Sequence, residues 1–181
     1  MRIGIDMDGV LANLTPLMIR YHNFTYNLRH PVSGYPTYDL TQTWECSREE
    51  VIKRIHDFYR SDFFNKIQPV KGARQGIKYL RQRHELVLIT ARPYFIETLS
   101  SNWLDNYFPG SFHKIVHTNL TTQQHEQKKN KSVICREERV ELMIDDALDY
   151  ALDCANAGVK VLLFDAVWNQ CKIPHKKITR L

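Results

Sequence analysis

Two aspartates spaced two residues apart, Asp6 and Asp8, follow an apolar run near the start of the chain, and Gly9 comes next. Side chains alternate along a strand, so this spacing puts both carboxylates on the same side as the strand ends. In open α/β sheets, ligands bind just beyond the carboxyl ends of the strands. The pattern therefore indicates a carboxylate pair at a functional site. An Asp-Gly hairpin turn is the alternative, but the residues after Val10 do not alternate as a returning strand would.

Polar residues also end two later apolar runs. Thr90 closes the first and is followed by Ala91, while Asp145 and Asp146 close the second. A hydroxyl and backbone N–H groups at a helix start bind anions, and the alternative is that Thr90 only caps the next helix. A helix start is likewise the alternative for Asp146. Both positions are candidates for contact with an anionic ligand or a metal.

Carboxylates gathered at neighbouring strand ends repel one another and raise one another's pKa. A hard cation with oxygen ligands removes that cost, and Mg²⁺ is commonly held by one or two carboxylates together with a substrate phosphate. The aspartates that follow the apolar runs therefore predict a magnesium site where the strand ends meet.

Five short apolar runs have the character of β-strands and must position these residues. They are Arg2–Met7, Glu85–Thr90, Lys114–His117, Val140–Asp145 and Val159–Phe164. The second and the fifth are almost continuously apolar, as in strands buried on both faces of a parallel sheet. Helical patterns separate the runs, and this alternation is typical of an open α/β fold.

Residues 12–70 interrupt the alternation. Ser47 and Glu50 have the spacing of a capping box, which predicts a helix from there through Tyr59. No convincing strand pattern occurs in this segment. We predict a helical cap at 12–70, inserted into a catalytic core of residues 1–11 and 71–181.

Three large aromatic residues of the cap, Tyr35, Tyr38 and Trp44, lie in an irregular stretch. Helix packing explains large rings poorly there, so they are candidates for contact with the substrate. The alternative is that they pack the cap's own small core.

Composition limits the classes of function. The 181 residues are 43% hydrophobic and 25% charged with a net charge of +5, which describes a folded domain with a mild excess of positive charge. That excess suits a phosphate ester as well as nucleic acid, and the scattered basic residues predict no nucleic acid polymer as partner. The four cysteines form no CxxC pair, which argues against zinc. The early aspartates do not fit a signal peptide, and no run approaches the roughly 20 apolar residues of a membrane span. We therefore predict a cytoplasmic protein without a membrane partner.

In chain order, Asp6-x-Asp-Gly-Val, Thr90, a lysine near 131 and Asp145-Asp146 resemble the haloacid dehalogenase-like hydrolase superfamily. The motifs most similar to cytosolic-type 5'(3')-deoxyribonucleotidases and their bacterial nucleotidase-like relatives are Asp6-Met-Asp-Gly-Val-Leu-Ala12, Thr90-Ala-Arg-Pro93, Trp103-Leu104 and Ile144-Asp-Asp146. The resemblance implies a Rossmann-like three-layer α/β sandwich. Its five-stranded parallel sheet would have the order 5-4-1-2-3, with the small helical cap inserted after the first strand.

The resemblance also implies Mg²⁺-dependent hydrolysis of a phosphomonoester, with a nucleoside monophosphate as the expected substrate. Asp6 would be the nucleophile that forms an aspartyl-phosphate, and Asp8 the general acid and base. Met7, Thr90 and Ala91 would bind the phosphoryl oxygens.

The implied metal ligands are the Asp6 carboxylate, the Asp8 backbone carbonyl and Asp146, with Asp145 behind them. A lysine would neutralise the charge that develops on the phosphoryl group. Lys131, which directly precedes a predicted helix start, is the favoured candidate; Lys129 is next, and Lys128 also lies upstream of the fourth strand.

Three alternative functions remain for comparison. The first is a phosphatase for another small phosphorylated metabolite, and the second a non-catalytic phosphate-binding protein of the same fold. A receiver-type signalling domain fits poorly. Its adjacent acidic pair follows the first strand and its acceptor aspartate comes later, whereas here Asp6-x-Asp8 follows the first strand and the pair Asp145-Asp146 follows the fourth. A homodimer is left open.

Overall fold

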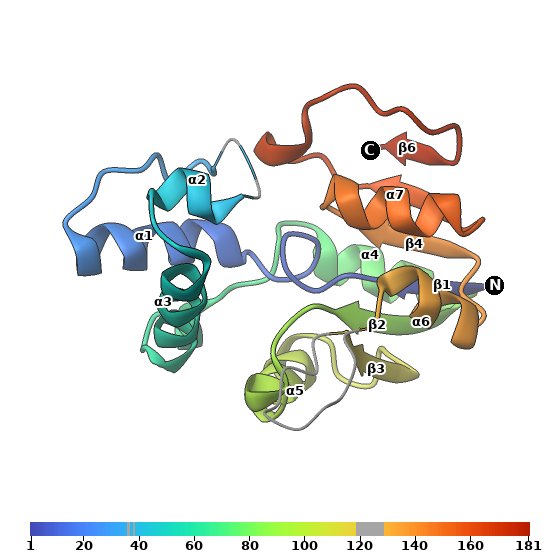
Figure 1. Cartoon of the computed structure of the whole chain (residues 1–181). Helices are drawn as coiled ribbons and strands as arrows, with labels where there is room; N and C mark the ends of the chain where they lie inside the picture. The colour runs from blue at the N-terminus through green and yellow to red at the C-terminus, as the bar shows by residue number, and fades with distance from the viewer. Residues whose placement is uncertain (36, 38, 119–128) are drawn as a thin grey trace.

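The computed structural model describes residues 1–35, 37, 39–118 and 129–181. The chain forms an α/β fold around one parallel sheet (Figure 1). The strands are β1 (Arg2–Ile5), β2 (Glu85–Thr90), β3 (Lys114–His117), β4 (Leu142–Asp145), β5 (Lys160–Leu163) and β6 (Ile178–Arg180). The α-helices are α1 (Leu14–Tyr26), α2 (Leu40–Trp44), α3 (Arg48–Arg60), α4 (Ala73–Leu80), α5 (Glu97–Tyr107), α6 (Lys131–Glu137) and α7 (Leu148–Asn156), and the 3₁₀ helices are η1 (Phe64–Lys66), η2 (Tyr94–Ile96) and η3 (Val167–Asn169).

Within the described residues the sheet has six parallel strands in the order β3-β2-β1-β4-β5-β6. The expectation of five strands in the order 5-4-1-2-3 is therefore wrong in number. Counted in the same direction, the observed order is 6-5-4-1-2-3, because β6 extends the sheet beyond β5. The sequence Ile178-Thr-Arg180 is too short and polar to stand out as a strand, and charged residues flanking it are common at a sheet edge. Three strands are also shorter than predicted: β1 ends at Ile5, β4 begins at Leu142, and β5 spans Lys160–Leu163.

The apolar side chains of the strands divide between two buried clusters, one on each face of the sheet. On β2, Leu86 and Leu88 belong to the first cluster, and Val87 and Ile89 to the second. This is the alternation that a strand buried on both faces requires. Helices α4 and α5 contribute to the first cluster and α6 and α7 to the second, so the architecture is a three-layer sandwich.

Helices α1, α2 and α3 lie together at the end of the sheet toward which β1 runs (Figure 1). Helix α3 begins after Ser47, whose Oγ accepts a hydrogen bond from the Glu50 N–H at 3.3 Å, as the capping box predicts. The helix ends at Arg60, one residue later than expected. The assignment of 12–70 as a separate cap domain stays a prediction.

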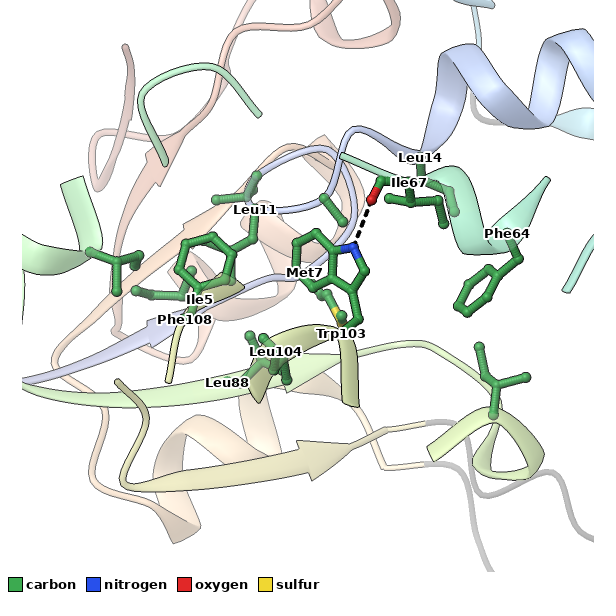
Figure 2. Close-up of a cluster of buried hydrophobic side chains, with 14 of the residues drawn as sticks. Ile5, Met7, Leu11, Leu14, Phe64, Ile67, Leu88, Trp103, Leu104 and Phe108 are labelled. Atoms are coloured by element: carbon green, nitrogen blue, oxygen red, sulfur yellow. Dashed lines mark hydrogen bonds between the residues drawn. The ribbon is translucent and has the colours of Figure 1, made fainter. Parts of the chain in front are cut away.

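The segment that returns from these helices is anchored to the core by Trp103 on α5. Figure 2 shows the Trp103 indole among Met7, Leu11 and Leu104, with its Nε1 donating a hydrogen bond to the Ile67 carbonyl oxygen at 2.8 Å. This contact helps to hold the helical segment against the strand ends. No helix in the part of the chain that the structure describes combines the length and apolar character needed to cross a membrane.

Candidate active site

A buried cluster of charged side chains lies where β1 and β4 end. Asp6 directly follows β1, its backbone N–H bonds to the Ile144 carbonyl at 2.9 Å, and the residue is 7% exposed. Lys131, the first residue of α6, is buried and places its Nζ 2.8 Å from Asp6 Oδ1 and 2.7 Å from Asp145 Oδ2. One ammonium group therefore holds the carboxylates that end two neighbouring strands.

Asp146 completes this cluster. Asp6, Asp145 and Asp146 can each present a carboxylate oxygen such that all three atoms lie within 4.8 Å of one another. Asp145 Oδ1 also accepts a hydrogen bond from the Ala147 N–H at 3.0 Å. Gly9 leaves room for Asp146: its φ is +79°, and a Cβ there would lie 1.9 Å from Asp146 Oδ2. Only glycine fits this close approach in this backbone conformation.

The electrostatics of the cluster reflect its burial. Loss of solvation raises the pKa of Asp6 to about 7, with Lys131 opposing the shift and Asp145 adding to it. Burial disfavours the charged form of Lys131, but the carboxylates of Asp145 and Asp6 outweigh it and hold the pKa above its ordinary value. When all are ionised, the three carboxylates and the single ammonium leave two negative charges in excess. A divalent cation would balance that charge.

Asp8 is paired with a cation of its own. Arg92 Nη2 lies 2.6 Å from Asp8 Oδ1 and Arg92 Nε lies 2.9 Å from Oδ2, which makes a two-pronged contact. The Arg92 side chain is fully buried, whereas that of Asp8 is 24% exposed. The sequence motif Thr90-Ala-Arg-Pro93 contains Arg92, but we assigned it no role. Its partner lies 84 residues away in the chain, so no local spacing could have revealed the contact.

The proposed phosphate-binding residues occupy different environments. Thr90 is buried, and its Oγ accepts a hydrogen bond from the Arg92 N–H at 3.2 Å, so it does stabilise the following turn. No α-helix starts directly after Thr90, because the chain continues to η2 before α5 begins at Glu97. Ala91 lines the cavity described below. The Met7 side chain is fully buried, so only its backbone could reach a phosphate. The phosphate-binding roles of these residues stay predictions.

A cavity of about 670 Å³ opens over Asp6 and Asp8. The helical segment supplies one wall, which includes Leu14, Met18, Ile55 and Tyr59. Residues beyond β4 and β5, among them Tyr150 and Trp168, supply the other. Asp6 and Asp8 are therefore accessible from a cavity large enough for a small organic molecule.

Of the candidate aromatic residues, Tyr35 and Trp44 have the alternative placement, in a small buried core. Tyr35 and Trp44 are buried among the residues between α1 and α3, and neither lines the cavity. The Trp44 Nε1 donates to the Tyr35 hydroxyl at 3.0 Å, and the Trp44 ring stacks on His22 at 4.2 Å between centroids. Each polar group thus has a partner, which allows both rings to be buried. Tyr38 lies outside the described residues.

Of the candidate lysines, the structure brings Lys131 to the site. Lys129 is half exposed and pairs with Glu137 at 2.9 Å on the surface. Lys128 lies outside the described residues. Asp6, Asp8, Asp145, Asp146 and Lys131 thus all lie at one end of the sheet. The positions of the strand ends predicted this for the aspartates, and the family resemblance implied it for Lys131.

Comparisons with known proteins identify the family and the fold that the chain is similar to. Residues 1–170 match the model of the family described as "5' nucleotidase, deoxy (Pyrimidine), cytosolic type C protein". "Putative nucleotidase YqfW" of Bacillus subtilis is 25% identical over 174 residues, which are 96% of this chain and 84% of that protein. The haloacid dehalogenase-like family hydrolase SP0104 from Streptococcus pneumoniae has a TM-score of 0.68 at 12% identity, over 93% of this chain and 87% of its own. The magnesium-bound "putative HAD-hydrolase YfnB" from Bacillus subtilis has a TM-score of 0.63 at 16% identity, over 99% of this chain and 93% of its own.

Proposed function

We propose that this chain, which belongs to the cytosolic type C 5' nucleotidase family of the haloacid dehalogenase-like superfamily, is a Mg²⁺-dependent hydrolase of phosphate monoesters. The observation that carries the proposal is the buried cluster of Asp6, Asp145 and Asp146. Lys131 contacts Asp6 and Asp145, and Asp6 lines a cavity. Carboxylates are rarely buried this closely without a cation to bind or a reaction to perform.

Asp6 is the proposed nucleophile. Its carboxylate oxygen attacks phosphorus, the bond from phosphorus to the leaving oxygen breaks, and that oxygen takes a proton from the Asp8 carboxyl group. A water molecule then attacks the aspartyl-phosphate and gives a proton to Asp8. The bond between Asp6 and phosphorus breaks, which releases inorganic phosphate and restores both carboxyl groups. Lys131 fixes the Asp6 carboxylate through Oδ1 and adds positive charge next to it.

The residues present fit a magnesium ion. Carboxylate oxygens are its preferred ligands, the cluster has an excess of negative charge, and Gly9 keeps space beside Asp146. Asp145 is engaged by Lys131 through one oxygen and by the Ala147 N–H through the other. This supports a place for Asp145 behind the direct ligands, which would be Asp6, Asp146 and the Asp8 backbone carbonyl. When bound, the ion would neutralise charge on the phosphoryl group. The magnesium in the related YfnB structure agrees with this choice of cation.

A nucleoside monophosphate is the proposed substrate. The family description names a deoxy-pyrimidine nucleotidase. Arg92 is the one cation among the described residues that line the cavity, and it is already paired with Asp8. The described walls therefore offer no cation for a second phosphate, and favour an uncharged leaving group. Tyr59, Tyr150 and Trp168 provide aromatic surface against which a base could pack.

A panel of phosphomonoesters, assayed with Mg²⁺ and with EDTA, tests the proposal. We expect turnover of nucleoside monophosphates that requires metal and is lost in Asp6→Asn. Mg²⁺ should also raise the Tm of the wild type, and raise it less in Asp146→Ala. Binding of phosphate without turnover of any ester would contradict the proposal, and would support a non-catalytic phosphate-binding protein instead.

A further inference from the structure

Each of the three nitrogens of the Arg92 guanidinium has a hydrogen-bond partner inside the protein. Nε and Nη2 contact the Asp8 carboxylate, and Nη1 donates to Ser100 Oγ at 3.1 Å. The guanidinium also lies 5.2 Å from the centre of the Phe64 ring. A side chain that is fully buried and engaged in this way is poorly placed to bind the substrate itself.

Two further contacts fix the backbone from which Arg92 projects. Its N–H donates to Thr90 Oγ at 3.2 Å, and its carbonyl oxygen accepts a hydrogen bond from His117 Nδ1 at 3.2 Å. Both partners are buried at the ends of adjacent strands, β2 and β3. The guanidinium is therefore held by the rigid sheet, and not by a surface loop.

Asp8, in contrast, has few other constraints. It lies beyond the end of β1 in the turn that contains Gly9, and its side chain faces the cavity. Within the described part of the chain, the hydrogen bonds to its carboxylate all come from Arg92. A planar guanidinium that contacts both oxygens fixes the plane of the carboxylate as well as its position.

We propose that Arg92 is a positioning residue that orients the Asp8 carboxylate toward the leaving-group oxygen in the cavity. The inference rests on the proposed function, in which Asp8 gives its proton to that oxygen. Proton transfer by a positioned side chain contributes roughly 10²- to 10⁴-fold to a rate, and the contribution depends on geometry. Loss of the guanidinium should therefore weaken leaving-group protonation while leaving Asp6, Lys131 and the metal ligands in place.

Leaving groups of different acidity separate this role from a general structural one. A nucleoside 5'-monophosphate releases a primary alcohol, which needs a proton as the bond breaks. p-Nitrophenyl phosphate releases a stable phenolate, which does not. The kcat/KM for each substrate reports the steps up to leaving-group departure, so the later hydrolysis of the aspartyl-phosphate does not obscure the comparison.

The experiment measures kcat/KM on both substrates for the wild type, Arg92→Met, Asp8→Asn and the double variant. We expect Arg92→Met to lose on the order of 10- to 100-fold on the nucleoside monophosphate, part of the full acid–base contribution, and less than about threefold on p-nitrophenyl phosphate. In the Asp8→Asn background, Arg92→Met should have almost no further effect, because both changes remove the same function. Arg2→Met is the matched control: Arg2 makes a similar contact with Glu85 at the opposite end of β1, and its loss should leave both values unchanged.

Equal losses on the two substrates would overturn the inference, since Arg92 would then act on the phosphoryl group or on the fold. Multiplicative losses in the double variant would also overturn it. If Arg92→Met does not fold, Arg92→Lys serves instead, because it keeps the charge without the two-pronged contact and should show the same selective loss. If the wild type hydrolyses neither ester, the proposed function is contradicted. Failure of the Arg92 inference is a different result, because the wild type would then be active and only the variants would depart from expectation.

Discussion

Replacing Lys131 by Met should destabilise the protein strongly in the absence of metal. The ammonium is fully buried and contacts both Asp6 and Asp145, which are themselves buried. Removing one partner of a buried ion pair leaves uncompensated charge, and typically costs about 3–5 kcal/mol. For a chain of this size each kcal/mol lowers the Tm by about 2–4 °C, so we expect a decrease of roughly 6–20 °C in EDTA.

Magnesium should recover part of this loss. Without the lysine, the three carboxylates attract a divalent cation more strongly, so the Mg²⁺-induced rise in Tm should be larger in Lys131→Met than in the wild type. A ligand at 100 times its Kd contributes about 2.7 kcal/mol, which is enough to offset much of the deficit. Activity should not recover, because the cation that fixes Asp6 Oδ1 is gone, and removal of a comparable charge-stabilising group costs on the order of 10²- to 10³-fold in kcat.

Thermal melting with and without Mg²⁺ measures both effects, and Lys129→Met is the matched control. Lys129 lies two residues away and pairs with Glu137 at the surface, with both side chains about half exposed, so its loss should cost about 0–1 kcal/mol. The double variant Lys131→Met/Asp145→Asn should be more stable than Lys131→Met, since it removes one of the unpaired carboxylates. If Lys131→Met melts within about 2 °C of the Lys129 variant, a difference of about 1 kcal/mol or less, the buried-charge reasoning is refuted.

Two other predictions concern Gly9 and His22. Gly9→Ala should weaken the binding of Mg²⁺ and lower kcat, because the added Cβ would lie 1.9 Å from Asp146 Oδ2. The same dependence of the Tm on Mg²⁺ concentration in the variant and the wild type would contradict this. His22 is buried beside Arg54 and His30. Burial, followed by electrostatic interaction with these two neighbours, lowers the pKa of His22 from 6.5 to about 4. Because the unfolded chain binds the proton first, stability measured by urea unfolding should fall as the pH drops from 6.5 toward 4. His22→Phe should make stability less dependent on pH in this range. The raised pKa of Asp6 has the opposite effect on stability as the pH falls, so the measurement is made in saturating Mg²⁺, which should keep Asp6 ionised.

The elements that sequence reasoning located well are those whose hydrophobic pattern is set by the sheet. The continuous apolar run Glu85–Thr90 predicted a strand buried on both faces, and β2 has those bounds. The rule that parallel strands end at one edge also predicted that Asp6 and Asp145 would meet. The strand β6 was missed because its three residues carry no such pattern, and β5 provides its pairing.

The cap residues show why the remaining positions were harder. The irregular stretch allows Tyr35 and Trp44 either to face a ligand or to pack in a small core, and the structure shows the second. An irregular backbone by itself says little about burial. Their mutual hydrogen bond satisfies both polar groups, and the stacked His22 ring comes from a helix whose position no local pattern reveals. The residues that do line the cavity from this side include Met18 on α1 and Ile55 on α3. A helical hydrophobic pattern does not distinguish such residues from core residues.

Asp6 and Asp8 come from one short motif, yet the fold gives each a different cation. Lys131 reaches Asp6 from the first turn of α6 and shares its charge with Asp145, so Asp6 remains within a cluster that still attracts a metal. Arg92 reaches Asp8 from the end of β2 and contacts both carboxylate oxygens, so Asp8 is withdrawn from that cluster. A nucleophile must act next to the metal, whereas a proton carrier must face the leaving group. In the proposed mechanism, two buried cations, Lys131 from the start of α6 and Arg92 from beyond the end of β2, allow two carboxylates of the same type to take different roles.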